Sequence, residues 1–422
     1  MNLDIFARLN KDTNKARLLA ASFFMNMGVD TAYFVGFVGY VAYGFNANVT
    51  IIATTMAILA ICSMVGNFMG GIIVDKLGPR RTAFYSNMTM ALICVAMSFM
   101  TFRLTAFMVM TGVFGVVSSV QQSAFHTFAP YLSREREGIR RINSFMTTSM
   151  FIATMLGGIL GALITTAFEP QYLFSMVAAV VIVSGVMVLF VREKYSPHSP
   201  TAAADSPVAK AAKENAHPLH TALEGWHLIR KTATLRFYLL VAIAMWFCFG
   251  AFDALESVYY RDVLLMPISW MGWINALISG GLAIGAFALS KIPGKYVSTF
   301  LLVILLGVEG VTTVLYVATT SPFWSAVGAF LLGIAFGVFS PLLNTLIQVD
   351  TPLKAAGRVM GTIDTIRRGF TFIPLAIAPT LSRLWGVQPV LVGASLMTIL
   401  LAVALYPVSR RLDIARAGTA AQ

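Results

Sequence analysis

Long apolar segments alternate with short polar ones along almost the whole chain. A helix that crosses a bilayer needs about 20 mostly apolar residues, because it rises about 1.5 Å per residue across a hydrocarbon core about 30 Å thick. Twelve segments meet this requirement. They lie at residues 18–43, 50–74, 82–102, 104–129, 145–168, 172–191, 237–258, 269–290, 298–318, 322–347, 359–382 and 387–407. The pattern predicts an all-α membrane protein with 12 transmembrane helices.

This pattern breaks between the sixth and seventh predicted spans. Residues 195–218 are rich in Pro, Ala and Ser and show no apolar periodicity, which is typical of a flexible linker. Residues 219–231 place four apolar side chains on one side of a helix, and they predict an amphipathic helix on the inner membrane surface. The four side chains are Leu219, Leu223, Trp226 and Ile229.

The break divides the chain into two halves that resemble each other. The predicted parts are an N-terminal six-helix half at 1–194, a cytoplasmic linker with the amphipathic helix at 195–232, and a C-terminal six-helix half at 233–422. Gly28-Val29-Asp30 recurs loosely as Gly250-Ala251-Phe252-Asp253, which places the two aspartates 223 residues apart. Pro130 and Pro352 lie 222 residues apart. These offsets indicate an internal duplication, and six-helix repeats are a known plan of secondary transporters.

Lys and Arg concentrate on alternate connections. With the N-terminus placed in the cytoplasm, 25 of the 30 Lys and Arg residues fall in cytoplasmic segments and 3 in outer loops. Cytoplasmic loops of membrane proteins collect these residues. We therefore expect a multi-pass protein of the cell's inner membrane with both termini in the cytoplasm. The net charge of +12 then faces anionic membrane lipids, and no nucleic-acid partner is expected.

The composition agrees with a membrane protein and excludes a disordered chain. Hydrophobic residues make up 58% of the sequence and charged residues only 11%, against about 25% charged in soluble domains. Three cysteines, Cys62, Cys94 and Cys248, lie in apolar segments and predict neither a disulfide framework nor a metal site. No P-loop, zinc-protease or nucleophile-elbow motif is found, so we expect no enzyme and no cofactor.

The connection after the second predicted span reads GGIIVDKLGPRR, residues 70–81. It resembles the signature that the major facilitator superfamily carries between its second and third helices. The matching residues are Gly71, Asp75, Lys76, Gly78, Arg80 and Arg81. The resemblance implies the major facilitator fold and an inner gate that Asp75 and the basic residues form against the second half. The alternative is that these charges only set the topology.

Longer segments narrow the resemblance to one branch of this superfamily. They resemble the 12-helix drug:proton antiporters that include macrolide efflux pumps and the enterobactin exporter. The segments are 126–144, 224–236, 249–264 and 348–361. The resemblance implies a monomer that exports small molecules. In the fifth predicted span, Gly158 stands where the antiporter motif usually has proline.

Ionisable side chains within membrane helices are costly, by about 3 kcal/mol on insertion scales, and are therefore functional hypotheses. Asp30 lies at the midpoint of the first predicted span, on a helix that lines the pathway in the superfamily it resembles. A carboxyl placed there can take up and release a proton. We predict that Asp30 couples transport to protons or another cation. The alternative is a structural acid that is hydrogen-bonded to a neighbouring helix.

Asp253 and Glu256 lie three residues apart in the seventh predicted span, which places them on one face. Two nearby carboxylates share a proton or attract a cation. We predict that they bind a cationic substrate or relay protons. The alternatives are an outer gate element and a partner for Arg261. Glu309 lies in the middle of the ninth predicted span, and its role is left open.

Further polar residues are candidates with two readings each. Asp364 and Arg368 lie four residues apart on one predicted helix and form a possible charge pair, or, with Arg367, bind an anionic group. Three amides lie on presumed pathway helices and are candidates for substrate contact. They are Asn26, Gln121 and Asn344. The alternative for the amides is hydrogen bonding between helices.

Together these features predict a secondary transporter that exchanges protons for lipophilic small molecules by alternating access. The alternative is a lipid flippase or a nutrient carrier of the same fold that is not a proton-coupled exporter. A membrane receptor without transport is a third class. The predicted gate motif and the duplicated halves argue against a receptor.

Overall fold

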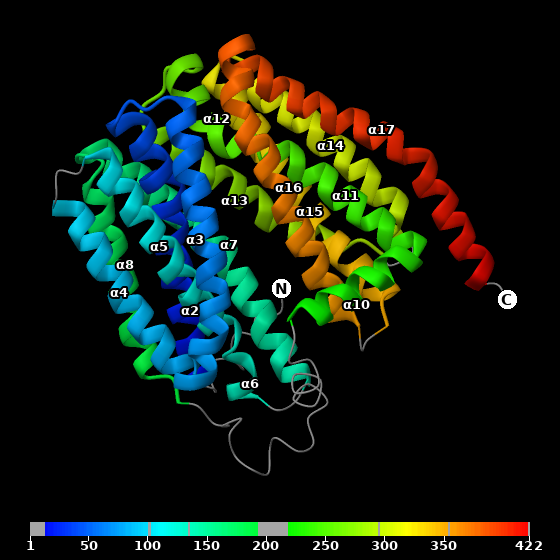
Figure 1. The fold of residues 1–422 in the computed structure, drawn as a ribbon, viewed down its shortest axis with the longest axis horizontal. Coiled ribbons are helices and arrows are strands. Elements are labelled where there is room, and N and C mark those ends of the chain that lie inside the picture. The colour runs from blue at the N-terminus through cyan, green and yellow to red at the C-terminus, as the bar shows by residue number, and fades with distance from the viewer. Residues whose placement is uncertain are drawn as a thin grey trace. The chain divides into compact units, whose positions relative to one another are not determined.

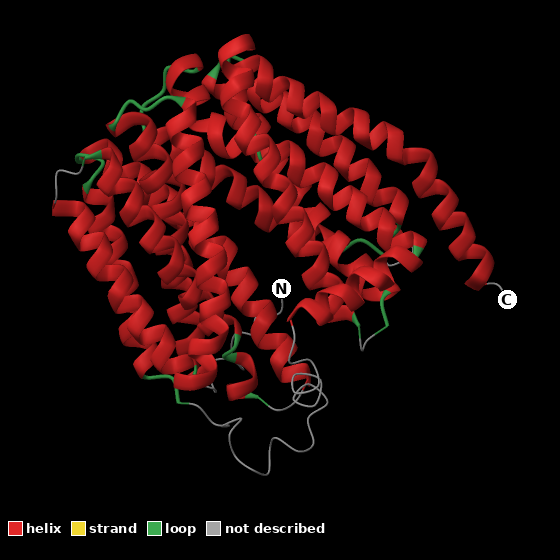
Figure 2. Cartoon of the chain, viewed as in Figure 1, coloured by secondary structure: helices red, strands yellow, loops and turns green. Residues whose placement is uncertain are grey.

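The computed structural model describes residues 13–99, 103–133, 136–192, 218–293, 296–352 and 355–420. Within these ranges the chain consists of helices joined by loops and turns (Figures 1 and 2). The predicted all-α membrane fold is therefore confirmed. The predicted flexible linker, apart from its last residue, lies outside the described residues.

The described helices form two compact units, and α13 contributes to both. The first unit comprises the described residues of Met1–Ser206 and Met266–Ala276. The second comprises those of Pro207–Leu265 and Leu277–Gln422.

Helices of the first unit, besides the start of α13, follow the chain in order. They are α2 (Thr13–Thr31), η1 (Ala32–Gly44), α3 (Val49–Leu77), α4 (Pro79–Phe99), α5 (Leu104–His126), α6 (Ala129–Leu132), α7 (Arg136–Ala167) and α8 (Tyr172–Leu189). Buried Leu18, Val74 and Phe125 belong to one apolar core cluster in this unit, contributed by α2, α3 and α5.

The second unit contains the remaining helices. They are α10 (Pro218–Lys231), α11 (Ala233–Phe249), α12 (Phe252–Val258), η2 (Tyr259–Val263), α13 (Ser269–Leu289), α14 (Thr299–Val317), α15 (Pro322–Asp350), α16 (Ala356–Trp385) and α17 (Val387–Ala420). Buried Tyr238, Leu306 and Leu342 mark its apolar core, contributed by α11, α14 and α15.

Eleven helical stretches among the described residues are long and apolar enough to cross a membrane. Several join two elements, as where α2 continues into η1 to form one stretch, Thr13–Gly44. α16 is a further long helix of 30 residues. Its apolar character is reduced by Asp364, Arg367 and Arg368. The 12 predicted spans thus correspond to eleven apolar stretches and one helix with charged residues.

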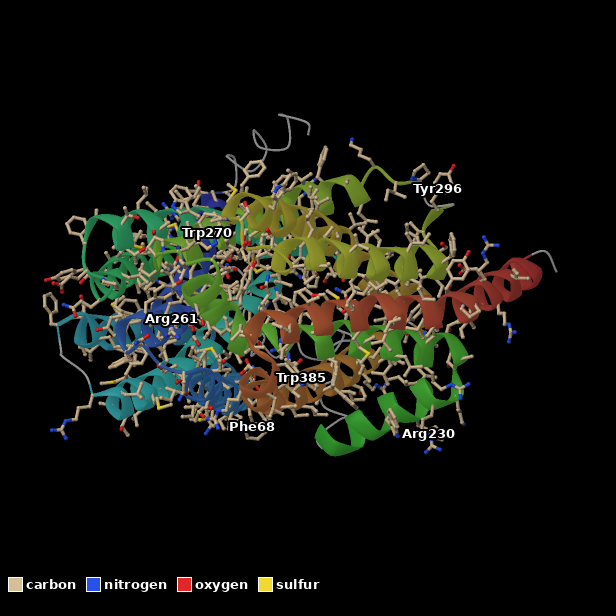
Figure 3. All side chains as sticks on the ribbon, turned by 90° about the horizontal axis from the view of Figure 1, so that it is seen from above. Phe68, Arg230, Arg261, Trp270, Tyr296 and Trp385 are labelled. Atoms are coloured by element: carbon tan, nitrogen blue, oxygen red, sulfur yellow. The ribbon has the colours of Figure 1, made fainter. Side chains whose placement is uncertain are left out.

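Large apolar side chains are exposed as well as buried. Phe68 on α3 is 69% exposed, and Trp385 at the end of α16 is 65% exposed (Figure 3). Exposed apolar surface of this kind is unfavourable in water. Lipid tails can cover it because they are themselves apolar.

The turn between α3 and α4 explains one residue of the predicted gate motif. α3 begins after Asn48, whose side chain accepts a hydrogen bond from the backbone N–H of Ile51 at 3.1 Å. It ends at Gly78, which has a φ of +80°. Glycine takes this conformation without the steric cost that a Cβ would add. Pro79 then begins α4, so the glycine and proline together make a tight helical hairpin.

Small residues bring helix backbones close together in both units. A Cβ on Gly66 of α3 would lie 2.3 Å from the carbonyl oxygen of Val116 on α5. In the second unit, a Cβ on Gly285 of α13 would lie 2.1 Å from the carbonyl oxygen of Ile334 on α15. Van der Waals contact through small residues is the usual means by which membrane helices associate.

The predicted amphipathic helix exists as α10, but one side of it packs on protein. A Cβ on Gly225 would lie 2.8 Å from the carbonyl oxygen of Arg358 on α16, and Ile229 is fully buried in the core of the second unit. Glu224 also forms an ion pair with Arg358. Trp226 remains 40% exposed. Part of the apolar side of α10 thus packs on protein, and its place at the inner membrane surface stays a prediction.

Candidate functional site

Asp30 lies near the end of α2 and is hydrogen-bonded to α7. Its Oδ2 accepts a hydrogen bond from the hydroxyl of Thr154. The residue is half-buried, and its carboxyl has no ion-pair partner among the described residues. A Cβ on Gly157, one turn beyond Thr154, would lie 2.8 Å from the carbonyl oxygen of Met27. This glycine therefore permits the close approach of α7 to α2 at the level of Asp30.

A hydroxyl partner suits a carboxyl that changes its protonation state. The hydroxyl of Thr154 can donate to a charged carboxylate or accept from a protonated one. A Lys or Arg partner would instead favour the charged form alone. Asp30 thus has an environment that can bond both forms.

The other candidates in the first unit are tied into the helices. Asn26 is buried and donates through Nδ2 to the carbonyl oxygen of Ser22 at 2.8 Å, within its own helix. Gln121 of α5 is fully buried and donates through Nε2 to the Oδ1 of Asn87 on α4 at 2.6 Å. Hydrogen bonding within and between helices therefore describes both amides better than substrate contact does.

Asp253 and Glu256 lie on α12 and differ in their surroundings. The Oε1 of Glu256 accepts hydrogen bonds from two tyrosine hydroxyls, that of Tyr260 at 2.8 Å and that of Tyr316 on α14. Asp253 makes no hydrogen bond or ion pair with a described residue, and both residues are half-buried. Glu256 is thus held in place, whereas Asp253 is available to a ligand or a proton.

The tyrosines around Glu256 were not among the predicted site residues. Tyr260 lies four residues after Glu256 and could have been recognised from that spacing. Tyr316 comes from a distant segment, and nothing in the local sequence indicates its contact. Arg261, considered as a partner for the two carboxyls, forms an ion pair with Asp262 at 2.6 Å. The π-helical turn η2 begins directly after α12, and such turns often occur at functional sites.

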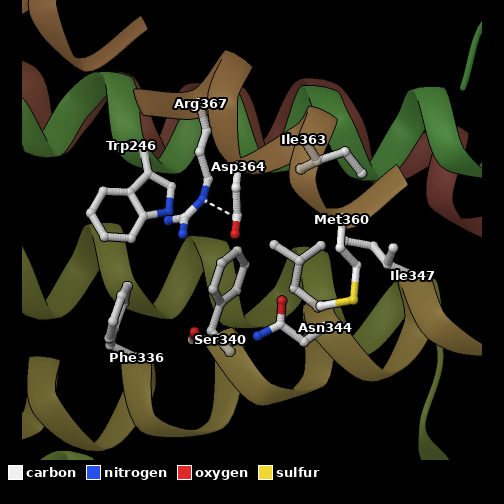
Figure 4. A pocket seen from close by; sticks show the side chains of 11 residues that line it. Trp246, Phe336, Ser340, Asn344, Ile347, Met360, Ile363, Asp364 and Arg367 are labelled. Carbon is white, nitrogen blue, oxygen red and sulfur yellow. Dashed lines mark hydrogen bonds and ion pairs between the residues drawn. The ribbon is translucent and has the colours of Figure 1, made fainter. Parts of the chain in front are cut away.

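Asp364 pairs with Arg367 and not with Arg368. The Nε of Arg367 lies 2.7 Å from the Oδ1 of Asp364, and its guanidinium lies over the ring of Trp246, 4.5 Å from the centroid (Figure 4). Arg368 is exposed. The predicted pair is thus wrong by one residue. Neighbouring side chains on a helix point about 100° apart, so only one of the two arginines shares this direction.

A small cavity in the second unit is lined by this pair. Its volume is about 30 Å³. Its polar lining includes Ser340, Asp364, Arg367 and the predicted amide Asn344, and Figure 4 shows these side chains facing one another from α15 and α16. A cavity of this size holds about one water molecule or a small polar group.

The predicted gate motif lies at the exposed turn between α3 and α4. Arg80 donates a hydrogen bond to the carbonyl oxygen of Leu189 at the end of α8. The other charged motif residues are exposed and form no hydrogen bond or ion pair with a described residue. They are Asp75, Lys76 and Arg81. Gly71 is exposed, and a Cβ there would meet no atom within 4 Å. The gate role stays a prediction.

Glu309 on α14 is fully buried. Neither of its carboxyl oxygens has a hydrogen-bond partner. The hydroxyls of Thr312 and Thr313 donate to the backbone oxygen of Glu309 and not to its side chain. Within the ranges that the structure describes, no group of three or more His, Cys, Asp or Glu residues could hold a metal ion.

Comparison with known proteins assigns the family. A family model described as Major Facilitator Superfamily matches residues 19–374. The chain is 24% identical over 349 residues to the multidrug resistance protein MdtG of Erwinia billingiae, which is 82% of this chain and 80% of the relative. It is 22% identical over 386 residues to the uncharacterized MFS-type transporter YfiS of Bacillus subtilis, which is 88% of this chain and 87% of the relative.

Solved structures share the fold at low sequence identity. The nucleoside transporter NupG aligns with a TM-score of 0.70 and 12% identity over 93% of this chain and 98% of its own. A structure of proton dependent oligopeptide transporters aligns with a TM-score of 0.70 and 13% identity over 95% of this chain and 100% of its own.

These comparisons support the superfamily and not the narrower branch of macrolide and enterobactin exporters that four segments of the sequence resemble. The relative from Erwinia billingiae is named for multidrug resistance and not for macrolide efflux or enterobactin export. The family model covers most of the 422 residues, including the gate motif and both carboxyl sites. The chain therefore belongs to the Major Facilitator Superfamily, as a multi-pass membrane transporter and not an enzyme.

Proposed function

We propose that this transporter exports lipophilic small molecules in exchange for protons. The observation that supports this proposal is the chemistry around the intramembrane carboxyls. Asp30 is half-buried, and its carboxyl accepts a hydrogen bond from the hydroxyl of Thr154. Hydroxyls can bond both the charged and the protonated carboxyl. Such carboxyls can therefore load and release a proton without losing their partners.

A proton gradient would supply the energy. The sequence contains no nucleotide-binding P-loop, so a secondary energy source is required. Moving one charge across about 100 mV provides about 2.3 kcal/mol. In this proposal Asp30 carries the coupled proton, and Asp253, which is bonded to none of the described residues, interacts with the proton or with a cationic substrate. Alternating access then exposes the loaded site to each side in turn.

The substrate class follows from the relatives and from the apolar composition. Two of this chain's relatives are named multidrug resistance protein, and these names support a proposal of several different drugs as substrates. Flexible side chains such as the 22 methionines can adapt an apolar surface to several ligands. Macrolides and siderophore-like molecules are the finer classes to test, since four segments of the sequence resemble exporters of these compounds. In this proposal the protein works as a monomer.

Efflux from cells tests the proposal. Cells that express the wild type are compared with cells that express Asp30→Asn, with a lipophilic dye and a macrolide as substrates, with and without a protonophore. Asp262→Asn serves as the control, because Asp262 lies in an exposed ion pair. We expect protonophore-sensitive efflux from the wild type and from Asp262→Asn, and none from Asp30→Asn at equal expression. Efflux from the wild type that survives the protonophore would instead support the uncoupled carrier.

A further inference from the structure

We propose that Arg367 and Trp246 form a binding point for the anionic head group of an amphiphilic substrate. The proposal deepens the export function and rests on it for the statement that the ligand is cargo. It starts from the position of Arg367, which lies in the middle of α16 with its side chain only 19% exposed. A buried or half-buried arginine within a membrane helix is costly unless it serves a partner.

The guanidinium of Arg367 is held from two sides. Asp364 accepts a hydrogen bond from Nε at 2.7 Å, and the ring of Trp246 lies under the guanidinium at 4.5 Å. These contacts fix the plane and the direction of the group (Figure 4). An arginine that is already oriented loses less conformational freedom when it binds a ligand.

The terminal N–H groups of Arg367 are left without a protein acceptor. Arginine has five N–H donors, and only the one on Nε is used in a hydrogen bond with a described residue. The remaining four lie on the two terminal nitrogens. Two parallel N–H groups match the two oxygens of a carboxylate or phosphonate, and such bidentate pairs are among the strong hydrogen bonds of proteins.

The cavity beside Arg367 fits a head group better than a whole drug. Its volume of about 30 Å³ is small compared with the ~300 Å³ or more of pockets that enclose drug-sized ligands. Asn344 and Ser340 supply further polar groups, while Phe336 and Met360 supply apolar surface. This mixture suits an organic anion with an apolar body.

Asp364 is not expected to prevent binding. Its side chain is 52% exposed, so solvent screens its charge from a second anion, and its contact with Nε leaves the terminal nitrogens of Arg367 open to that anion. The neighbouring Arg368 offers a matched control, because it carries the same charge on the same helix but does not line the cavity. Recognition by charge alone would involve both arginines, whereas the proposed site involves Arg367.

Binding of a matched pair of probes to the purified full-length protein tests the site. Naphthylacetate carries a carboxylate, and naphthylacetamide has the same apolar body with a neutral amide. We expect the wild type to bind the carboxylate about 10-fold more tightly than the amide, which corresponds to about 1.4 kcal/mol. Arg367→Gln should remove this preference, and Arg368→Gln should retain it. Arg367→Lys should retain only part of it, because lysine cannot make the bidentate, stacked contact.

Several outcomes would overturn the proposal. Equal binding of both probes to the wild type would exclude an anion site, and so would equal loss of preference in Arg367→Gln and Arg368→Gln. Thermal melting of each variant shows whether it is folded. If Arg367→Gln does not fold, Trp246→Phe replaces it and should weaken the carboxylate preference without removing it.

Transport measurements separate cargo from a lipid head group. The purified protein is reconstituted into phosphatidylcholine vesicles with its cytoplasmic side facing outward. Flux of naphthylacetate into these vesicles is measured with and without added phosphatidylglycerol. Flux that depends on Arg367 supports the ligand as cargo. Two results would overturn the statement that the ligand is cargo. One is binding of naphthylacetate without flux, and the other is competition by phosphatidylglycerol that is lost in Arg367→Gln. A third outcome would reject only this site and leave the proposed function intact. In that outcome the efflux of a neutral dye is proton-coupled, but the protein binds naphthylacetate no more tightly than naphthylacetamide.

Discussion

The two units each place a carboxyl within a membrane helix, but they support it differently. Asp30 has one hydroxyl partner, Thr154, from a neighbouring helix. Asp253, at the position predicted to correspond in the second half, has no hydrogen-bond partner among the described residues, while Glu256 one turn later is bonded to Tyr260 and Tyr316. The two aspartates thus lie at similar places in the predicted halves and have unlike surroundings.

This difference indicates that the two sites have separate tasks. A carboxyl with a single hydroxyl partner can exchange a proton at small structural cost. A carboxyl bonded to two tyrosines on two elements, α14 and η2, also fixes those elements relative to each other within the second unit. We therefore expect changes at Asp30 to affect coupling most, changes at Asp253 to affect ligand or proton access, and changes around Glu256 to affect stability.

The largest expected effect is that of Asp30→Asn on coupled transport. Asparagine keeps the size and the hydrogen bond to Thr154 but cannot exchange a proton. We expect gradient-driven efflux to fall by about 100-fold or more, in the range typical for loss of a proton-transferring group. Efflux rates at matched expression measure this. If Asp30→Asn transports at the same rate as the wild type, Asp30 has a structural role and does not couple transport to protons.

The next effect separates Asp253 from Glu256. Asp253→Asn removes a carboxyl that has no protein partner, and we expect transport of a cationic dye to fall by about 10-fold. Glu256→Gln keeps an oxygen that can accept from Tyr260 and Tyr316, and we expect a fall of less than about 3-fold. Initial rates over a range of dye concentrations measure both. A larger loss of transport in Glu256→Gln than in Asp253→Asn would instead assign the proton- or substrate-binding role to Glu256.

The hydroxyl partners should have similar effects on stability and different effects on transport. Thr154→Val removes the one partner of Asp30, and Tyr316→Phe removes one of two partners of Glu256. Hydrogen bonds between membrane helices contribute about 0.6 kcal/mol on average. We expect each change to lower the free energy of unfolding by about this amount, and Thr154→Val to reduce transport more. Melting curves in detergent and efflux rates are the measurements. An equal loss of transport in both variants would argue against separate tasks.

The smallest expected effect on transport is that of Glu309→Leu. Burial of a polar group without a hydrogen-bond partner costs about 1–3 kcal/mol in proteins. Leucine removes this cost at a fully buried position, so we expect a higher melting temperature and unchanged efflux. Glu169→Leu at an exposed loop is the control and should give no stabilisation. A loss of efflux in Glu309→Leu would place a third carboxyl in the pathway.

Much of the fold could be predicted from the sequence because the bilayer imposes a simple length and polarity requirement on each helix. The apolar segments predicted the spans and left a connection between residues 74 and 82, where the structure has its turn at Gly78. α16 was predicted although its predicted span, residues 359–382, contains three charged residues, since the apolar residues still extend over a membrane thickness.

The partners of the polar residues could not be predicted in the same way. Which of Arg367 and Arg368 pairs with Asp364 depends on the rotation of α16, and a shift of one residue turns a side chain by about 100°. The contact of Tyr316 with Glu256 joins residues 60 positions apart. Ile229 is buried in the core of the second unit because of tertiary packing. The amphipathic pattern of residues 219–231 could not show this, because helices on a membrane surface have the same pattern.

The coupling role of Asp30 is tested most directly with purified protein in proteoliposomes that enclose a pH-sensitive dye. A lipophilic cation is added outside, and the internal pH is followed as the substrate moves. We predict that substrate movement through the wild type changes the internal pH and that Asp30→Asn abolishes the pH change, while Asp262→Asn keeps it. Substrate movement through the wild type with no pH change, or an equal pH change with Asp30→Asn, would contradict the account.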